Sequence, residues 1–174
     1  MTRQSHFTSL HGVMLNINGF GVLITGKAGV GKSSLALELL HQGHQLIADD
    51  IVDFKYDDTT VMAQCPELLS ALLHTRELGV MDVRALFQHQ AWQAEYRIDY
   101  VVMLQEDKQT ISDPLAANEL DFTILGQSFP CLTLTIQNPA SIAHRLLTWL
   151  NLKAGKHNGK AILLQRQSSL MNHL

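Results

Sequence analysis

The sequence lacks the features that would tie the chain to a membrane, to nucleic acid or to an oxidising compartment. No apolar run approaches the ~20 residues that span a bilayer, and the first residues do not resemble a signal peptide. A net charge of −3 is too small to attract nucleic acid or an anionic membrane through bulk electrostatics. Cys65 and Cys131 form no CxxC pair, so we expect free thiols in a reducing cytoplasm. These absences favour a cytoplasmic protein without a nucleic-acid or membrane partner.

Markers of a second domain are also missing. The 174 residues contain no internal repeat, low-complexity tract or interdomain linker. Hydrophobic residues make up 46% of the chain, which is enough for one full core. We therefore expect residues 1–174 to form a single α/β domain with a mixed central sheet flanked by helices.

A glycine-rich segment between a buried strand and a helix predicts a phosphate-binding loop. The residues before it (21–25) are apolar, and those after it (34–40) place apolar side chains at helical spacing. Its glycines let successive N–H groups converge on a phosphate chain, while Lys32 would reach the β- and γ-phosphates and Ser33 would bind Mg²⁺. The predicted nucleotide-binding residues are Gly26, Lys27, Ala28, Gly29, Val30, Gly31, Lys32, Ser33 and Ser34. This pattern indicates that the chain binds a nucleoside triphosphate.

Hydrophobic periodicity predicts the other elements of the domain. Expected strands cover 11–17, 45–48, 100–104 and 131–137, and residues 51–56 should continue extended. Asn18-Gly19 is a hairpin turn signal. The helix after the loop should end near Gly43, and further helices are expected over 66–73 and 139–150. Residues 153–160 are expected as a polar loop, followed by a C-terminal amphipathic helix over 161–174.

Two adjacent carboxylates, Asp49 and Asp50, follow the strand that comes after the loop. An acidic residue there holds Mg²⁺ through water or accepts a proton from the nucleophile. Adjacent side chains on an extended strand point to opposite sides, so the two share a role only if the chain bends. The alternative is a solvated turn pair with no chemical role.

Several segments carry a more specific pattern: His11-Gly12, the loop 26–33, and residues 43–50, 66–69 and 76–87. Together they resemble the catalytic domain of bacterial HPr kinase/phosphorylase, in a short form without the N-terminal domain of many longer members. The resemblance implies that ATP, with Mg²⁺, phosphorylates a serine hydroxyl on a phosphocarrier protein. In many members phosphate also attacks the phosphoserine in the reverse reaction and yields pyrophosphate.

The resemblance also implies roles for individual residues. Asp49 matches the family's general base, which becomes the general acid in the reverse reaction, and Asp50 stands beside it as a further catalytic candidate. A neighbouring carboxylate and phosphate should raise the pKa of Asp49. His11 matches a histidine close to the transferred phosphate. Members of this family assemble as hexamers, so the resemblance implies a homo-oligomer in which a neighbouring subunit helps to receive the substrate.

Three positions depart from the family pattern. His74 stands where the family has a Mg²⁺-binding glutamate, and imidazole prefers Mn²⁺ or Zn²⁺. We expect Ser33 and His74 to bind the metal, with Mn²⁺ as the alternative to Mg²⁺; Glu77 or water would replace His74 if that side chain faces solvent. Residues 137–141 contain none of the arginines of the family's dephosphorylation loop, which puts the reverse activity in doubt. Gln88 replaces a glycine.

These observations leave two classes of function open. The first is an ATP-dependent serine kinase acting on an HPr-like phosphocarrier protein, or a kinase of the same chemistry with a small-molecule acceptor. The second is a regulator that binds a nucleotide without turnover. Lys32, Ser33, Asp49 and His11 favour the enzyme, since a binding module needs no base; His74 and the missing arginines favour the regulator.

Overall fold

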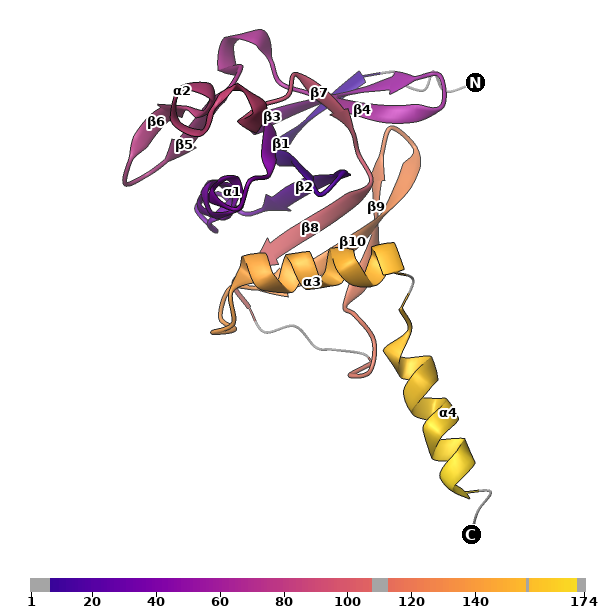
Figure 1. The fold of residues 1–174 in the computed structure, drawn as a ribbon. Helices are drawn as coiled ribbons and strands as arrows, with labels where there is room; N and C mark the ends of the chain where they lie inside the picture. Colours follow the sequence, from indigo (N-terminus) through magenta and orange to yellow (C-terminus); the bar gives the residue numbers. More distant parts are fainter. Residues whose placement is uncertain (1–6, 108–112, 156, 172–174) are drawn as a thin grey trace.

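The fold is built around an eight-stranded mixed sheet (Figure 1). The computed structural model describes residues 7–107, 113–155 and 157–171. Across the sheet the strand order is β7-β4-β3-β1-β2-β8-β10-β9. The strands are β1 (Phe7–Ile17), β2 (Phe20–Gly26), β3 (Gln45–Asp57), β4 (Thr60–Gln64), β7 (Glu95–Arg97), β8 (Tyr100–Gln105), β9 (Glu119–Ile124) and β10 (Gln127–Thr135).

Parallel pairing is confined to one half of the sheet. Strands β2 and β8 are parallel, as are β8 and β10, whereas the other neighbouring pairs are antiparallel. The β1–β2 pair is the hairpin expected at Asn18-Gly19, and both turn residues have positive φ. The expected mixed sheet flanked by helices is confirmed. The short strand expected over 45–48 and the extended segment expected over 51–56 form one continuous strand, β3.

Two helices cover one face of the sheet. They are α1 (Lys32–His41) and α3 (Ile142–Gly155). Their buried side chains, such as Leu39 and Leu146, share a core with Val22 and Ile24, which point from β2 to this face. Packing α1 against β1, β2 and β3 holds the start of the helix, and hence the glycine-rich loop, against the end of β2.

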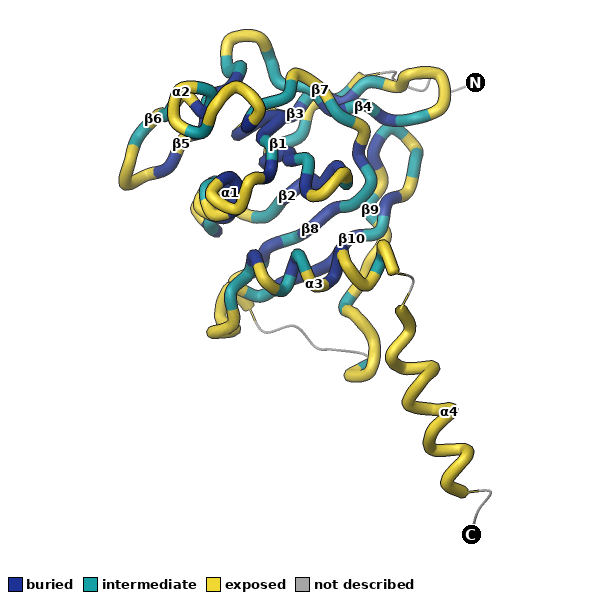
Figure 2. The backbone as a smooth tube through the Cα atoms, viewed as in Figure 1, coloured by how far each residue is buried: buried dark blue, intermediate teal, exposed yellow. Residues whose placement is uncertain are grey.

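The opposite face of the sheet forms a second core. Phe54 and Val61, from β3 and β4, share it with Ile124 and Phe129 from β9 and β10. The same cluster includes Met14 from the central strand β1, so this core extends across the face of the sheet, and Figure 2 shows the buried residues concentrated along the central strands. The inner parts of β1 and β3, next to the candidate site, are therefore held from both faces.

A small hairpin stands apart from the large sheet, beside α1 (Figure 1). It pairs β5 (Leu72–Thr75) with β6 (Gly79–Asp82) and leads into the short helix α2 (Val83–Phe87). The helix predicted over 66–73 is wrong: only a 3-10 turn, η1 (Glu67–Leu69), forms before β5. Periodicity cannot distinguish a short buried strand from a buried helix segment, and here pairing with β6 favours the strand.

The C-terminal region also differs from expectation. Residues 153–155 belong to α3 and 159–160 to α4 (Gly159–Met171), so the polar loop expected over 153–160 is much shorter. Residues 172–174 of the expected last helix lie outside the described residues. Helix α4 extends away from the body, and none of its residues is buried (Figures 1 and 2). Among the described residues, no helix is both long and apolar enough to cross a membrane.

Candidate active site

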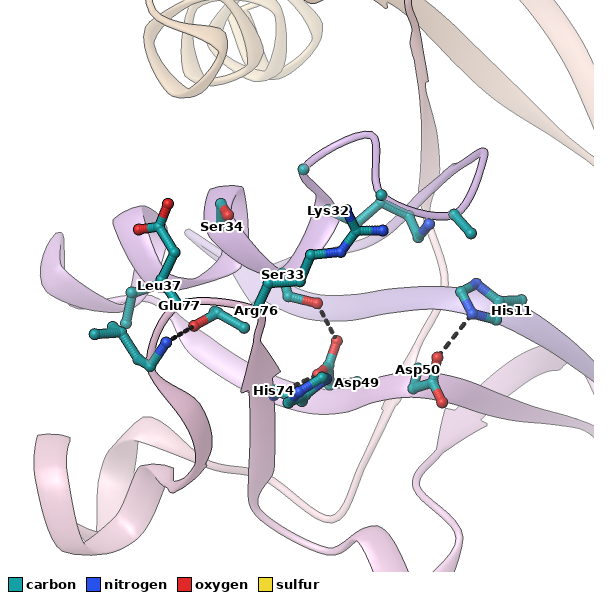
Figure 3. A pocket seen from close by; sticks show the side chains of 15 residues that line it. His11, Lys32, Ser33, Ser34, Leu37, Asp49, Asp50, His74, Arg76 and Glu77 are labelled. Carbon is teal, nitrogen blue, oxygen red and sulfur yellow. Dashed lines mark hydrogen bonds and ion pairs between the residues drawn. The ribbon is translucent and has the colours of Figure 1, made fainter.

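A cavity of about 550 Å³ opens beside the start of α1, and most of the predicted site residues line it (Figure 3). Its walls come from the glycine-rich loop, from β1 and β3, and from the turn between β5 and β6. The residues that line it are His11, Ala28, Gly29, Gly31, Lys32, Ser33, Ser34, Leu37, Asp49, Asp50, His74, Thr75, Arg76, Glu77 and Leu78. Gly26, Lys27 and Val30, also predicted for the site, are not among them.

The loop has the backbone shape that a phosphate cradle requires. Gly26, Gly29 and Gly31 all have positive φ, at 139°, 81° and 103°, a region that residues with a Cβ rarely adopt. Gly31 is the N-cap of α1, and no side chain caps the helix there. The first amide groups of α1 therefore remain available for an anion, and the positive end of the helix dipole adds to the attraction. These features fit a phosphate chain.

Lys32 is held against the loop rather than extended into solvent. Its side chain is buried, and Nζ donates to the carbonyls of Gly26 at 3.1 Å and Lys27 at 3.0 Å. Burial lowers the pKa of Lys32, while the charges of Asp50 and Asp49 oppose that shift. Gly26 and Lys27 thus act through their backbone oxygens. Val30 is buried and belongs to the helix-side core.

Asp49 is a buried carboxylate with both oxygens engaged. Oδ1 accepts from the Ser33 hydroxyl at 2.9 Å, and Oδ2 accepts from the His74 backbone N–H at 2.8 Å. The pKa of Asp49 is raised, as expected, although burial is the largest cause and the charge of Asp50 a smaller one; the hydrogen bonds act in the opposite direction. This geometry joins the loop serine, β3 and β5 at one carboxylate.

Asp50 faces a different group from its neighbour. Its Oδ1 lies 2.7 Å from Nε2 of His11 on the adjacent strand β1, and both side chains are more than half exposed. Asp50 has a φ of 71°, a left-handed bend within β3. The bend allows both adjacent aspartates to line the same cavity, which a regular strand would prevent. From the sequence, a bend in the chain was required for the two aspartates to act at one site, and the structure has that bend.

His74 lies on β5, not at the end of a helix, and lines the cavity near Ser33 and Asp49. Glu77 lines it too, from the turn after β5. Within the described ranges no group of three or more His, Cys, Asp or Glu side chains is arranged to hold a metal ion. A metal here would depend on Ser33, Asp49 and oxygens of phosphate or water. That shell suits Mg²⁺, which uses few carboxylates and retains water.

The sequence did not indicate four of the lining residues, which lie at the end of β5, in the β5–β6 turn and on α1. These are Thr75, Arg76, Leu78 and Leu37. Arg76 and Leu78 fall in the segment 76–87 that carried the family resemblance. That resemblance was the one indication in the sequence that they belong to the site. Nothing in the local pattern showed that the turn folds over the glycine-rich loop, because that contact joins residues almost fifty positions apart.

Comparisons with known proteins agree with this geometry. A family model described as "HPr Serine kinase C-terminal domain" matches residues 2–164. Proteins named HPr kinase/phosphorylase from Azoarcus sp. (strain BH72) and Geobacillus kaustophilus (strain HTA426) are each 41% identical over 138 residues, or 78% of this chain. A solved structure titled "Structure of the Hpr(Ser) kinase/phosphatase from Coxiella burnetii" superposes with a TM-score of 0.79 at 27% identity, covering 95% of this chain and 98% of that one.

The match covers only part of the curated relatives. This chain spans 44% of the Azoarcus protein and 44% of the Geobacillus protein. The family-model match over residues 2–164 includes the glycine-rich loop and both aspartates, whose geometry is described above.

Proposed function

The chain belongs to the HPr serine kinase C-terminal domain family, and on that basis we propose that it is an ATP-dependent serine kinase acting on an HPr-like phosphocarrier protein. One observation carries the proposal. A phosphate-shaped loop with a buried lysine, a Ser33–Asp49 pair and an exposed His11–Asp50 pair all line one cavity. A site that only binds nucleotide has no use for the second pair.

In the proposed reaction the serine oxygen of the acceptor attacks the γ-phosphorus of ATP. The bond from that phosphorus to the β,γ-bridging oxygen breaks, ADP leaves with the electron pair, and the serine proton must go to a base. We assign that base to Asp50 rather than Asp49. Asp50 is open to solvent and paired with His11, whereas both oxygens of Asp49 already accept hydrogen bonds within the protein.

His11 supports Asp50 in this role. An imidazole at 2.7 Å orients the carboxylate and can share the proton that it takes up. Lys32 stays beside the loop carbonyls, where its charge would meet the β- and γ-phosphates of a bound nucleotide.

Ser33 and Asp49 are the residues that we expect to hold a divalent cation, with His74 beside them. Bound Mg²⁺ or Mn²⁺ would neutralise charge on the β- and γ-phosphate oxygens. The Ser33–Asp49 hydrogen bond keeps the hydroxyl and the carboxylate together before an ion binds. These two side chains therefore need little rearrangement to bind a divalent cation.

The reverse reaction is expected to be weak. The turn 137–141 has no arginine, and none of its residues lines the cavity. Arg145, on α3, donates to the carbonyls of Ala140 and Thr135 at 3.2 and 3.0 Å, so its guanidinium is occupied in holding this turn. This turn therefore provides no arginine that could bind an attacking phosphate.

We also propose a homo-oligomer, a hexamer by family resemblance, in the cytoplasm. The exposed apolar side chains of α4, including Ile162, Leu164 and Leu170, support assembly, since this helix packs on none of the described residues of its own chain's core. Both cysteines are free thiols, which suits a reducing compartment.

The test is phosphoryl transfer from γ-labelled ATP to a purified phosphocarrier protein that contains a reactive serine, with Mg²⁺ or Mn²⁺. We expect label on the serine, and Lys32→Ala as the control should lose most nucleotide affinity because the lysine charge at the phosphates is gone. Label on a small molecule of a host lysate would instead identify a metabolite kinase. ATP binding without transfer to either would indicate a regulator.

A further inference from the structure

Arg76 lies directly over the glycine-rich loop. A Cβ built on Gly29 would be 2.7 Å from Nη2 of Arg76, 3.3 Å from Cζ and 3.5 Å from Nη1. The guanidinium therefore occupies the space that a side chain at position 29 would need. Figure 3 shows Arg76 reaching from the β5–β6 turn toward the part of the cavity where Lys32 and Ser33 lie.

The guanidinium of Arg76 has no partner among the described residues. Three other described arginines are engaged: Arg84 lies over the Trp92 ring, Arg97 donates to Asp99, and Arg145 donates to backbone carbonyls. Arg166 also has no partner among the described residues, but it lies on the exposed helix α4, away from the cavity. No hydrogen bond or ion pair involving Arg76 occurs in the parts of the chain that the structure describes. An exposed guanidinium held against a phosphate loop without a carboxylate partner is arranged to meet an anion.

We propose that Arg76 binds the transferred phosphoryl group of the nucleotide and stabilises the charge that develops on it, an inference that rests on the proposed kinase function. Lys32 approaches the phosphates from the loop itself, and Arg76 approaches from the β5–β6 turn on the other wall. A planar guanidinium donates two parallel hydrogen bonds to phosphate oxygens, which an ammonium group cannot do.

The proposal also explains a second requirement at Gly29. Its φ of 81° already favours glycine, and a methyl group at this position would require the Arg76 guanidinium to shift. Gly31 has a φ of 103°, and a Cβ added there would meet no atom within 4 Å. Substitution at Gly31 therefore strains the backbone alone, whereas substitution at Gly29 also displaces the guanidinium.

The first experiment compares ATP and ADP binding, and phosphoryl transfer, for wild type, Arg76→Ala, Arg76→Lys and Arg84→Ala. We expect Arg76→Ala to lower kcat by about 10³-fold, the lower end of the range for an arginine that acts on a transferred phosphoryl group. It should weaken ATP binding much more than ADP binding. Arg76→Lys should recover only part of the rate, and Arg84→Ala should match wild type.

Two measurements separate a chemical role from a structural one. Free guanidinium ion, at concentrations below those that unfold the protein, should restore part of the activity of Arg76→Ala. In a double-mutant cycle, Gly29→Ala should lose its effect in part when Arg76 is already alanine, whereas Gly31→Ala and Arg76→Ala should multiply independently, because local backbone strain cancels in the cycle.

Wild-type activity with unchanged kcat and unchanged ATP-over-ADP preference in Arg76→Ala would overturn this inference and leave the kinase proposal standing. A wild-type chain that binds no ATP would overturn both. Loss of activity together with a lowered unfolding temperature and no rescue by guanidinium would show that Arg76 supports the fold instead.

Discussion

Asp49 and Asp50 are neighbours in the chain, yet at the residue scale they face different groups. One is buried between a loop serine and a backbone amide; the other is exposed beside a histidine. A buried carboxylate that already accepts two hydrogen bonds suits the shell of a cation, whereas an exposed one can exchange a proton with a substrate. The left-handed bend at Asp50 allows both side chains to line one cavity although their partners differ.

We therefore expect opposite kinetic defects from two conservative substitutions. Asp50→Asn should retain nucleotide affinity but lower transfer by about 10²- to 10⁴-fold, the usual loss when a general base is removed. Asp49→Asn should weaken metal-dependent nucleotide binding, because the amide brings an N–H group to face the Ser33 hydroxyl or the His74 N–H. Titration calorimetry with and without metal, together with initial rates, measures both. Normal transfer by Asp50→Asn would return the base to Asp49.

His74 provides a test of metal preference at the same scale. His74→Glu should increase Mg²⁺-dependent activity, because a hard oxygen ligand replaces a nitrogen that Mg²⁺ binds reluctantly. The native chain should correspondingly prefer Mn²⁺ more strongly than the variant does. Metal titrations at saturating ATP measure this, with Glu77→Gln as the matched control. Superimposable curves for native protein and His74→Glu would exclude the His74 side chain from the metal shell.

At the scale of the elements, the junction after α2 carries local strain. Gln88 has φ 77° and ψ 161°, a backbone region that is essentially confined to glycine. The family resemblance implies a glycine at this position. Gln88 is exposed and begins the 3-10 turn η2 (His89–Ala91), so nothing in its side-chain packing requires glutamine.

Replacing Gln88 with glycine should therefore stabilise the protein. Relief of strain is worth about 1–3 kcal/mol, and the larger unfolded-state entropy of glycine offsets up to about 1 kcal/mol of it. Urea unfolding should show a higher midpoint for Gln88→Gly. Gln88→Ala, which keeps the strain, should not show this gain, and neither should Gln90→Gly two residues further on. A lower midpoint for Gln88→Gly would contradict the assigned conformation.

At the scale of the whole molecule, α4 is the one described α-helix that contributes no side chain to the core. All of its residues are exposed, including Leu170 and Met171 at 69% and 73%. Its apolar side chains are spread around the helix, as Ile162, Leu163 and Leu164 in succession show. Such a helix contributes to stability only when something else covers it.

Ending the chain at Gly155 should leave the fold intact and reduce the assembly. Measured on dissociated subunits, the unfolding temperatures of the shortened and full chains should differ by no more than about 2 °C, because removing α4 exposes no core side chain. Light scattering coupled to gel filtration should report a smaller particle for the shortened chain than for the full one, by more than the mass of the removed residues. If both chains form particles with the same number of subunits, α4 does not take part in the proposed oligomer.

The sequence by itself determined the nucleotide-binding half of this protein. Strand β2, the glycine-rich loop and α1 are contiguous, so the apolar run, the positive-φ glycines and the helical spacing act over some twenty neighbouring residues. The β1–β2 hairpin was predictable for the same reason, since Asn18-Gly19 sets the turn locally.

The tertiary structure alone decided what surrounds that loop. Leu72 and Leu73 became strand instead of helix because β6 pairs with them, and the resulting hairpin brings Arg76 against Gly29. A bend within β3 brought Asp49 and Asp50 to the same cavity, and partners on β1, β5 and the loop gave the two carboxylates different surroundings. These contacts join residues far apart in the chain, and their energies depend on long-range pairing and burial, which no local pattern of residues records.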